Sequence, residues 1–115
     1  MRRAISKTSK PARVSNLSPD PNQAGRYLLS GELTFDTVPA VYEQGHAMFA
    51  TPAPTLILSF INGAARTDSA GLALLVEWLR EARQHGKTLR FENIPAQLKD
   101  LARVSGLERV LPLDT

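Results

Sequence analysis

The 115-residue sequence contains no cysteine. This absence excludes disulfide bonds, thiol nucleophiles and every metal site that needs a cysteine ligand. The apolar runs are also far shorter than the roughly 20 residues that a membrane-spanning helix requires. The N-terminus is basic but lacks the apolar stretch of a signal peptide. We therefore expect a cytoplasmic protein that neither spans a membrane nor is exported.

The sequence also lacks the usual signatures of enzyme active sites. It has no glycine-rich phosphate loop ending in Lys-Ser/Thr, and no G-x-G-x-x-G segment after a strand. His46 and His85 fall on different predicted helices without the spacing of a zinc motif, so we expect both at the surface. Ser69 lacks the leading glycine and the nearby histidine of a hydrolase nucleophile. The sequence predicts no catalysis, no metal site and no cofactor.

Charge is divided unevenly along the chain. Residues 1–26 hold six basic residues and one acidic residue, whereas residues 27–115 hold eight basic and ten acidic residues. We predict a flexible basic leader over residues 1–11 and one folded domain, monomeric on its own, over residues 12–115. The leader either keeps the chain soluble or contacts anionic phosphates. No aromatic residue interleaves with its charges, so we expect no nucleic-acid binding.

The order of the predicted elements indicates an α/β fold. Hydrophobic spacing predicts strands at 12–17, 26–30, 56–61 and 88–92, helices at 34–50, 69–85 and 96–105, and a turn at 19–22. Asp36 or Thr37 would cap the first helix, and Gly86 and Gly106 would end the other two. This order places a mixed sheet against helices.

Asp68 and Ser69 stand where the strongest predicted helix begins. Serine is a favoured N-cap because its side-chain oxygen accepts a hydrogen bond from an early helix amide, and Asp68 would add charge at the positive helix end. The same position would stabilise a phosphate on Ser69 through unpaired amides and the helix dipole. From the residues alone, both roles stay open for Ser69.

Leu74 and Trp78 form a second notable feature of this helix. Helical spacing places them together, outside the stripe that carries Leu72, Leu75 and Leu79. Tryptophan is over-represented at binding hot spots, so the pair predicts a partner surface. The alternative is that the pair forms a second side of the core.

Two short segments, Ser30-Gly31-Glu32-Leu33 and Asp68-Ser69-Ala70-Gly71-Leu72, resemble motifs of the STAS domain. That family includes the anti-sigma factor antagonists and the MlaB-like cytoplasmic subunit of the Mla phospholipid-transport ABC system. The resemblance implies a mixed four-to-five-stranded sheet with helices packed mainly on one side. In the antagonists, the serine that matches Ser69 is phosphorylated by a kinase that is also the anti-sigma factor. In the lipid-transport subunit, the same region contacts the ABC ATPase.

Two positions favour the lipid-transport branch. Thr34 stands where the antagonists usually carry an aspartate, and Ala70 stands where they often carry a second hydroxyl residue. The resemblance therefore implies a non-enzymatic adaptor for the ATPase of an Mla-type ABC complex, which maintains outer-membrane lipid asymmetry. Such an adaptor would be peripheral to the inner membrane through its partner. The alternative is an anti-sigma factor antagonist that is regulated by an anti-sigma kinase through Ser69.

The residues expected at the partner surface lie around the start of the predicted helix or along its side: Thr34, Thr67, Asp68, Ser69, Ala70, Leu74 and Trp78.

Overall fold

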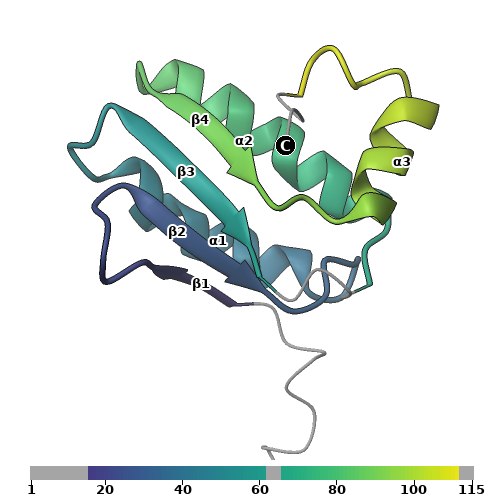
Figure 1. Cartoon of the computed structure of the whole chain (residues 1–115), viewed down its shortest axis with the longest axis horizontal. Helices are drawn as coiled ribbons and strands as arrows, with labels where there is room; N and C mark the ends of the chain where they lie inside the picture. Colours follow the sequence, from purple (N-terminus) through teal and green to yellow (C-terminus); the bar gives the residue numbers. More distant parts are fainter. Residues whose placement is uncertain (1–15, 62–65, 112–115) are drawn as a thin grey trace, which may run out of the picture.

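A computed structural model describes residues 16–61 and 66–111 (Figure 1). The predicted leader at residues 1–11, and the part of the first predicted strand that precedes Asn16, lie outside the described residues. The described elements follow the order β-β-α-β-α-β-α. The α/β prediction is therefore confirmed.

Four strands form one mixed sheet. In spatial order they are β1 (Asn16–Pro19), β2 (Arg26–Ser30), β3 (Thr55–Phe60) and β4 (Thr88–Glu92). β1 pairs antiparallel with β2, and the other two pairs are parallel. The predicted turn between β1 and β2 is present, because the Asn22 amide donates to Oδ1 of Asp20 at 2.8 Å.

Three helices accompany the sheet: α1 (Val38–Phe49), α2 (Ser69–Gln84) and α3 (Ala96–Val104). Figure 1 shows α1 and α2 on the same face of the sheet, with α3 beyond the end of β4. α1 begins later than predicted because the residues before it form a turn. There, the Thr37 hydroxyl donates to the Glu32 carbonyl at 2.6 Å and accepts from the Thr34 amide at 2.9 Å.

The two faces of the sheet differ in chemistry. Leu29, Leu58 and Phe91 point towards the helices and belong to the core. The opposite face carries Arg26, whose guanidinium lies 2.9 Å from Glu92 and 3.2 Å from the hydroxyl of Ser59. This second face is mixed, because the half-buried Leu28 and Ile57 also lie on it.

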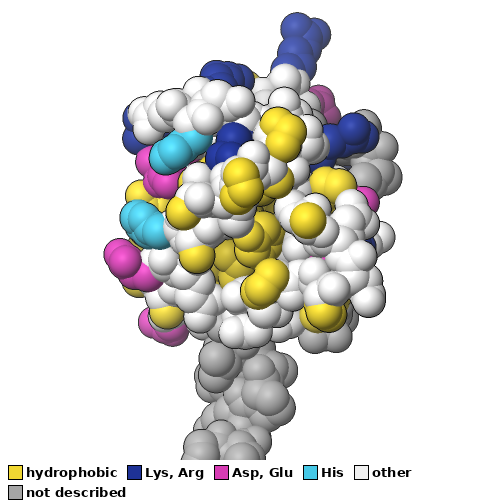
Figure 2. Space-filling model, turned by 90° about the vertical axis from the view of Figure 1, so that its left-hand side faces the viewer, with side chains coloured by type: hydrophobic (Ala, Val, Ile, Leu, Met, Phe, Trp, Pro, Cys, Tyr) yellow, Lys and Arg dark blue, Asp and Glu magenta, His cyan; other side chains and the backbone are white. Residues whose placement is uncertain are grey.

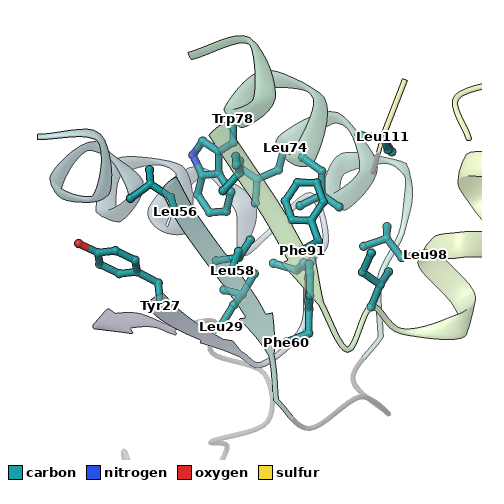
Figure 3. Close-up of a cluster of buried hydrophobic side chains, with 14 of the residues drawn as sticks. Tyr27, Leu29, Leu56, Leu58, Phe60, Leu74, Trp78, Phe91, Leu98 and Leu111 are labelled. Atoms are coloured by element: carbon teal, nitrogen blue, oxygen red, sulfur yellow. The ribbon is translucent and has the colours of Figure 1, made fainter. Parts of the chain in front are cut away.

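α2 buries more of its surface than the sequence predicts. Leu74 and Trp78 are 2% and 0% exposed, so the expectation that they form a surface patch is wrong. Figure 3 shows the Trp78 indole directed into the core, on the same side as Leu74 and Leu56. The physical reason is that α2 packs against α1 as well as against the sheet. Two adjacent stripes of the helix are therefore buried, and Leu79 of the predicted stripe is only half-buried.

Candidate functional site

Asp68, and not Ser69, is the N-cap of α2. Its Oδ1 accepts a hydrogen bond from the Ala70 amide at 2.8 Å, and its Oδ2 accepts one from the Phe35 amide at 3.3 Å. The backbone of Asp68 is extended, with φ −131° and ψ −167°, which places its carboxylate beside the first helical turn. The interpretation of Ser69 as the cap is therefore wrong. The Asp68 carboxylate thus caps α2 and also binds the loop that leads into α1.

Ser69 is the first residue of α2, and its side chain is exposed. Because Asp68 already caps the helix, the Ser69 hydroxyl is not needed for helix formation. It is open to contact by a partner or by a modifying enzyme. Its role as a phosphoacceptor stays a prediction.

The two segments that carry the sequence motifs lie side by side in the structure. Leu33 and Thr67 form a parallel β-bridge, and the Asp68 amide donates to the Leu33 carbonyl at 3.1 Å. A Cβ at Gly71 would lie 2.4 Å from Oγ1 of Thr67, so this contact requires glycine. The backbone pairing brings Thr34 and Thr67 close to the start of α2. Both side chains are buried, at 7% and 6% exposure, so they support this surface from inside.

An apolar groove of about 420 Å³ opens beside Ser69, between the first halves of α1 and α2. We call it the α1–α2 groove, and it is lined by Phe35, Val38, Pro39, Tyr42, Ala70, Ala73, Leu74 and Glu77. Phe35 is 82% exposed, whereas Leu74 contributes to the lining although it is almost fully buried. The predicted surface residues Ala70 and Leu74 therefore meet in this groove, and Trp78 does not line it.

Negative charge borders the α1–α2 groove. The hydroxyl of Tyr42 donates to Oε2 of Glu81 at 2.6 Å, which joins α1 to α2. This hydrogen bond, together with partial burial and the nearby carboxylates of Glu77 and Glu43, raises the pKa of Tyr42 above its ordinary value. The groove is thus apolar inside and bordered by carboxylates, of which Glu77 is paired with Arg80 at 2.9 Å.

A comparison with models of known protein families matches residues 21–112 to the family described as "Mlab, STAS domain". The chain belongs to the MlaB-like STAS-domain family. A comparison with curated protein sequences gave no match. STAS domains are generally non-enzymatic, and the four-stranded mixed sheet with three helices is consistent with their fold.

The sequence did not predict that Phe35, Val38 and Tyr42 line a surface groove. Val38 and Tyr42 lie in the helix predicted at 34–50 and share its apolar spacing. The packing of α1 against α2 places these partly buried side chains in the lining of the groove. The sequence contains no signal for Phe35, because it falls inside the helix predicted at 34–50. Only the later start of α1, at Val38, leaves Phe35 in the preceding turn and exposed.

A second hollow lies at the opposite end of the STAS domain. It has a volume of about 460 Å³ and lies between the β1–β2 turn and the loop that follows α1, with Tyr27 and Pro52 among its lining residues. Figure 2 views this end and shows hydrophobic side chains gathered around a hollow. Its two charged lining residues, Asp20 and Arg26, already form an ion pair at 2.6 Å. The hollow therefore presents no unpaired charge to a ligand.

Within residues 16–61 and 66–111, no three His, Asp or Glu side chains come together as a metal site. His46 and His85 are both exposed, as predicted. None of the helices in the described part of the chain is long and apolar enough to cross a membrane.

Proposed function

We propose that this STAS domain is a non-enzymatic adaptor that binds the cytoplasmic ATPase of an Mla-type phospholipid-transport ABC complex. The observation that carries the proposal is the exposed Phe35 at the edge of the α1–α2 groove, beside Ser69. An exposed aromatic side chain next to an apolar groove is the usual composition of a protein-binding hot spot. Membership in the MlaB-like family supports a transporter ATPase as the partner.

The chemistry of the groove favours a particular kind of partner segment. Its lining is almost entirely apolar, and Glu77 is its one charged lining residue. Glu43 and Glu81 lie close enough to act on Tyr42 electrostatically. Glu77 is already paired with Arg80, and Glu81 accepts from Tyr42. A partner segment with apolar anchors would bury its side chains in the groove, and a basic flanking residue would meet Glu43 at the border. Through such a partner, the domain would be peripheral to the cytoplasmic face of the inner membrane.

Co-purification tests this proposal. The full chain would be tagged in its native host and recovered under mild conditions, and bound proteins would be identified by mass spectrometry. We expect an ABC ATPase and other subunits of a lipid transporter. Recovery of no ABC ATPase, from cells in which such a transporter is expressed, would contradict the adaptor function.

A second candidate is an anti-sigma factor antagonist regulated by phosphorylation of Ser69. The observation in its favour is that Ser69 is exposed at the first position of α2, where a phosphate would meet the positive end of the helix. Neighbouring genes discriminate the two functions, because they should encode either transport subunits or a kinase and a sigma factor. Incubation with that kinase and ATP should then place phosphate on Ser69, whereas an unmodified Ser69 would exclude this candidate.

A further inference from the structure

The C-terminal end of α2 contributes to a pocket that is separate from the α1–α2 groove. The pocket has a volume of about 380 Å³ and lies between α2, the start of β4 and the segment that follows α3. Leu79, Ala82, Leu89 and Leu111 provide its apolar lining, and three cationic side chains, Arg83, Lys87 and Arg109, also line it. No acidic residue of the described chain lines this pocket. We call it the basic pocket.

The two arginines of the basic pocket, Arg83 and Arg109, make no ion pair among residues 16–61 and 66–111. The same is true of Arg66 and Arg90, but these two do not line the basic pocket. Arg26, Arg80 and Arg103, by contrast, each contact a carboxylate within 3.0 Å. Two guanidinium groups with unused donors therefore line one pocket, and such groups match the geometry of phosphate oxygens.

Lys87 adds a third positive charge in a fixed position. Its Nζ donates to the carbonyl oxygens of Thr51 and Ala53 at 2.6 and 2.7 Å, which holds the side chain in place. An ammonium group carries three donors, so one remains after these two bonds. These two carbonyls belong to residues that line the hollow beside Tyr27 and Pro52 and not the basic pocket. The ammonium group of Lys87 is therefore tied to that border, and its charge acts on the basic pocket from there.

The negative end of the α2 dipole lies at this end of the helix and opposes an anion, so the cationic side chains must outweigh it. The last carbonyl groups of the helix accept hydrogen bonds from the amides that follow: His85 donates to Glu81 at 3.1 Å, Gly86 to Arg83 at 3.0 Å and Lys87 to Ala82 at 2.8 Å. Gly86 has φ +68°, which permits this tight C-cap. These carbonyl oxygens are therefore occupied within the protein.

We infer that the basic pocket binds a phosphate ester whose organic part covers the apolar lining. Its volume lies within the range of about 300–1,000 Å³ that small-molecule sites usually have. The phosphate oxygens would lie between Arg83 and Arg109, with the charge of Lys87 nearby. Two sources offer this chemistry: a free phosphorylated metabolite and the headgroup of a phospholipid.

This inference does not rest on the proposed function. Ala70 lines the α1–α2 groove and Arg83 lines the basic pocket. These positions are separated by roughly 20 Å along the helix at 1.5 Å per residue. The two sites therefore lie at different ends of α2, and variants of one can be tested without altering the other.

The test uses the full chain and a pair of double variants with equal charge. Arg83→Gln/Arg109→Gln removes the two unpaired guanidinium groups, and Arg80→Gln/Arg103→Gln removes two exposed arginines that are paired with Glu77 and Asp100. Amide chemical shifts would be followed during titration with inorganic phosphate and with glycerol 3-phosphate. Binding to vesicles of phosphatidylglycerol and of phosphatidylcholine would be measured in parallel. Thermal unfolding of each variant checks that the fold is retained.

We expect Arg83→Gln/Arg109→Gln to weaken binding at least tenfold, and Arg80→Gln/Arg103→Gln to change it less than twofold. Saturable binding of glycerol 3-phosphate, with shifts at Thr88 and Leu89, would identify a free metabolite as the ligand. A tenfold loss seen only with phosphatidylglycerol vesicles would identify a lipid headgroup. Equal losses in both double variants, or no saturable binding to any probe, would overturn the inference.

Discussion

Gly45 in α1 lies directly against the indole ring of Trp78 in α2. A Cβ at residue 45 would lie 2.6 Å from Nε1 of Trp78 and 2.7 Å from two of its ring carbons. The indole nitrogen is buried and has no hydrogen-bond partner among the described residues. Glycine in the middle of a helix destabilises it by about 0.5–1 kcal/mol relative to alanine. Here, the close approach of the two helices explains why glycine occupies that position.

Gly45→Ala should therefore destabilise the protein, although alanine is the better helix former. We expect the free energy of unfolding to fall by about 1–3 kcal/mol, because the added methyl group forces the indole or α1 to move. Urea unfolding followed by circular dichroism would measure this change. Trp78→Phe supplies the control, since the smaller ring lacks the edge that the methyl group would meet. In that background Gly45→Ala should be much less destabilising, and an equal effect in both backgrounds would contradict the packing argument.

Trp78→Ala should act on stability and not on a contact surface. Removal of a fully buried aromatic side chain lowers the free energy of unfolding by about 3–5 kcal/mol, and Trp78 is 0% exposed. Binding to the partner, measured at a temperature where the variant remains folded, should change little. A variant of nearly unchanged stability with weakened binding would instead show that Trp78 reaches a partner.

The two residues at the start of α2 should respond differently to alanine. Asp68→Ala removes the side chain that bonds the Ala70 amide, and loss of an N-cap lowers stability by about 0.5–2 kcal/mol. Ser69→Ala leaves that cap in place, so its effect should stay within about 0.5 kcal/mol. Thermal unfolding of both variants would measure the difference. A larger loss of stability from Ser69→Ala than from Asp68→Ala would show that Ser69, and not Asp68, caps the helix.

Phe35 and Val104 form a matched pair for the binding surface, because each side chain is 82% exposed but only Phe35 lines the α1–α2 groove. On the proposed function, Phe35→Ala should weaken ATPase binding at least tenfold, or about 1.4 kcal/mol. Val104→Ala should leave binding unchanged, and both variants should keep their stability. Calorimetric titration of the purified ATPase with each variant would measure the dissociation constant. Equal binding by both variants would place the contact surface elsewhere.

Stability at acidic pH should depend on Asp20. The Asn22 amide and the Arg26 guanidinium bond its carboxylate and hold the pKa of Asp20 below its ordinary value. The ionised form is favoured in the folded state. Its contribution to stability is therefore present above the unfolded-state pKa of about 3.9 and is lost as the pH falls through the lower folded-state pKa.

Urea unfolding at several pH values would test this dependence. The stability advantage of the wild-type protein over Asp20→Asn should be greatest above about pH 5 and should shrink as the pH falls below about 4. Arg26→Gln removes the guanidinium but keeps the Asn22 amide, so it should retain part of the dependence. A difference that stays constant with pH would show that the Asp20 carboxylate does not contribute through its charge.

Most of the local elements of this protein can be predicted from its sequence. Arg26–Ser30 and Thr88–Glu92 are strands with the predicted bounds, and α2 begins at the predicted residue. Gly86 and Gly106 adopt positive φ where the sequence predicts helix ends. These outcomes depend on hydrophobic period and backbone preference, which act over a few neighbouring residues.

Which faces are buried, and where the surface groove lies, depends on how the elements pack together. A helix period cannot show that α2 packs against α1 as well as the sheet, and so it left open whether Trp78 belongs to a partner surface or to the core. It also gave no sign that Gly45 would meet the indole, or that Phe35 and Ala70 would line one groove. These relationships join residues that are more than 30 positions apart in the chain. They arise because both helices pack on the same face of one sheet, a choice that local preferences do not encode.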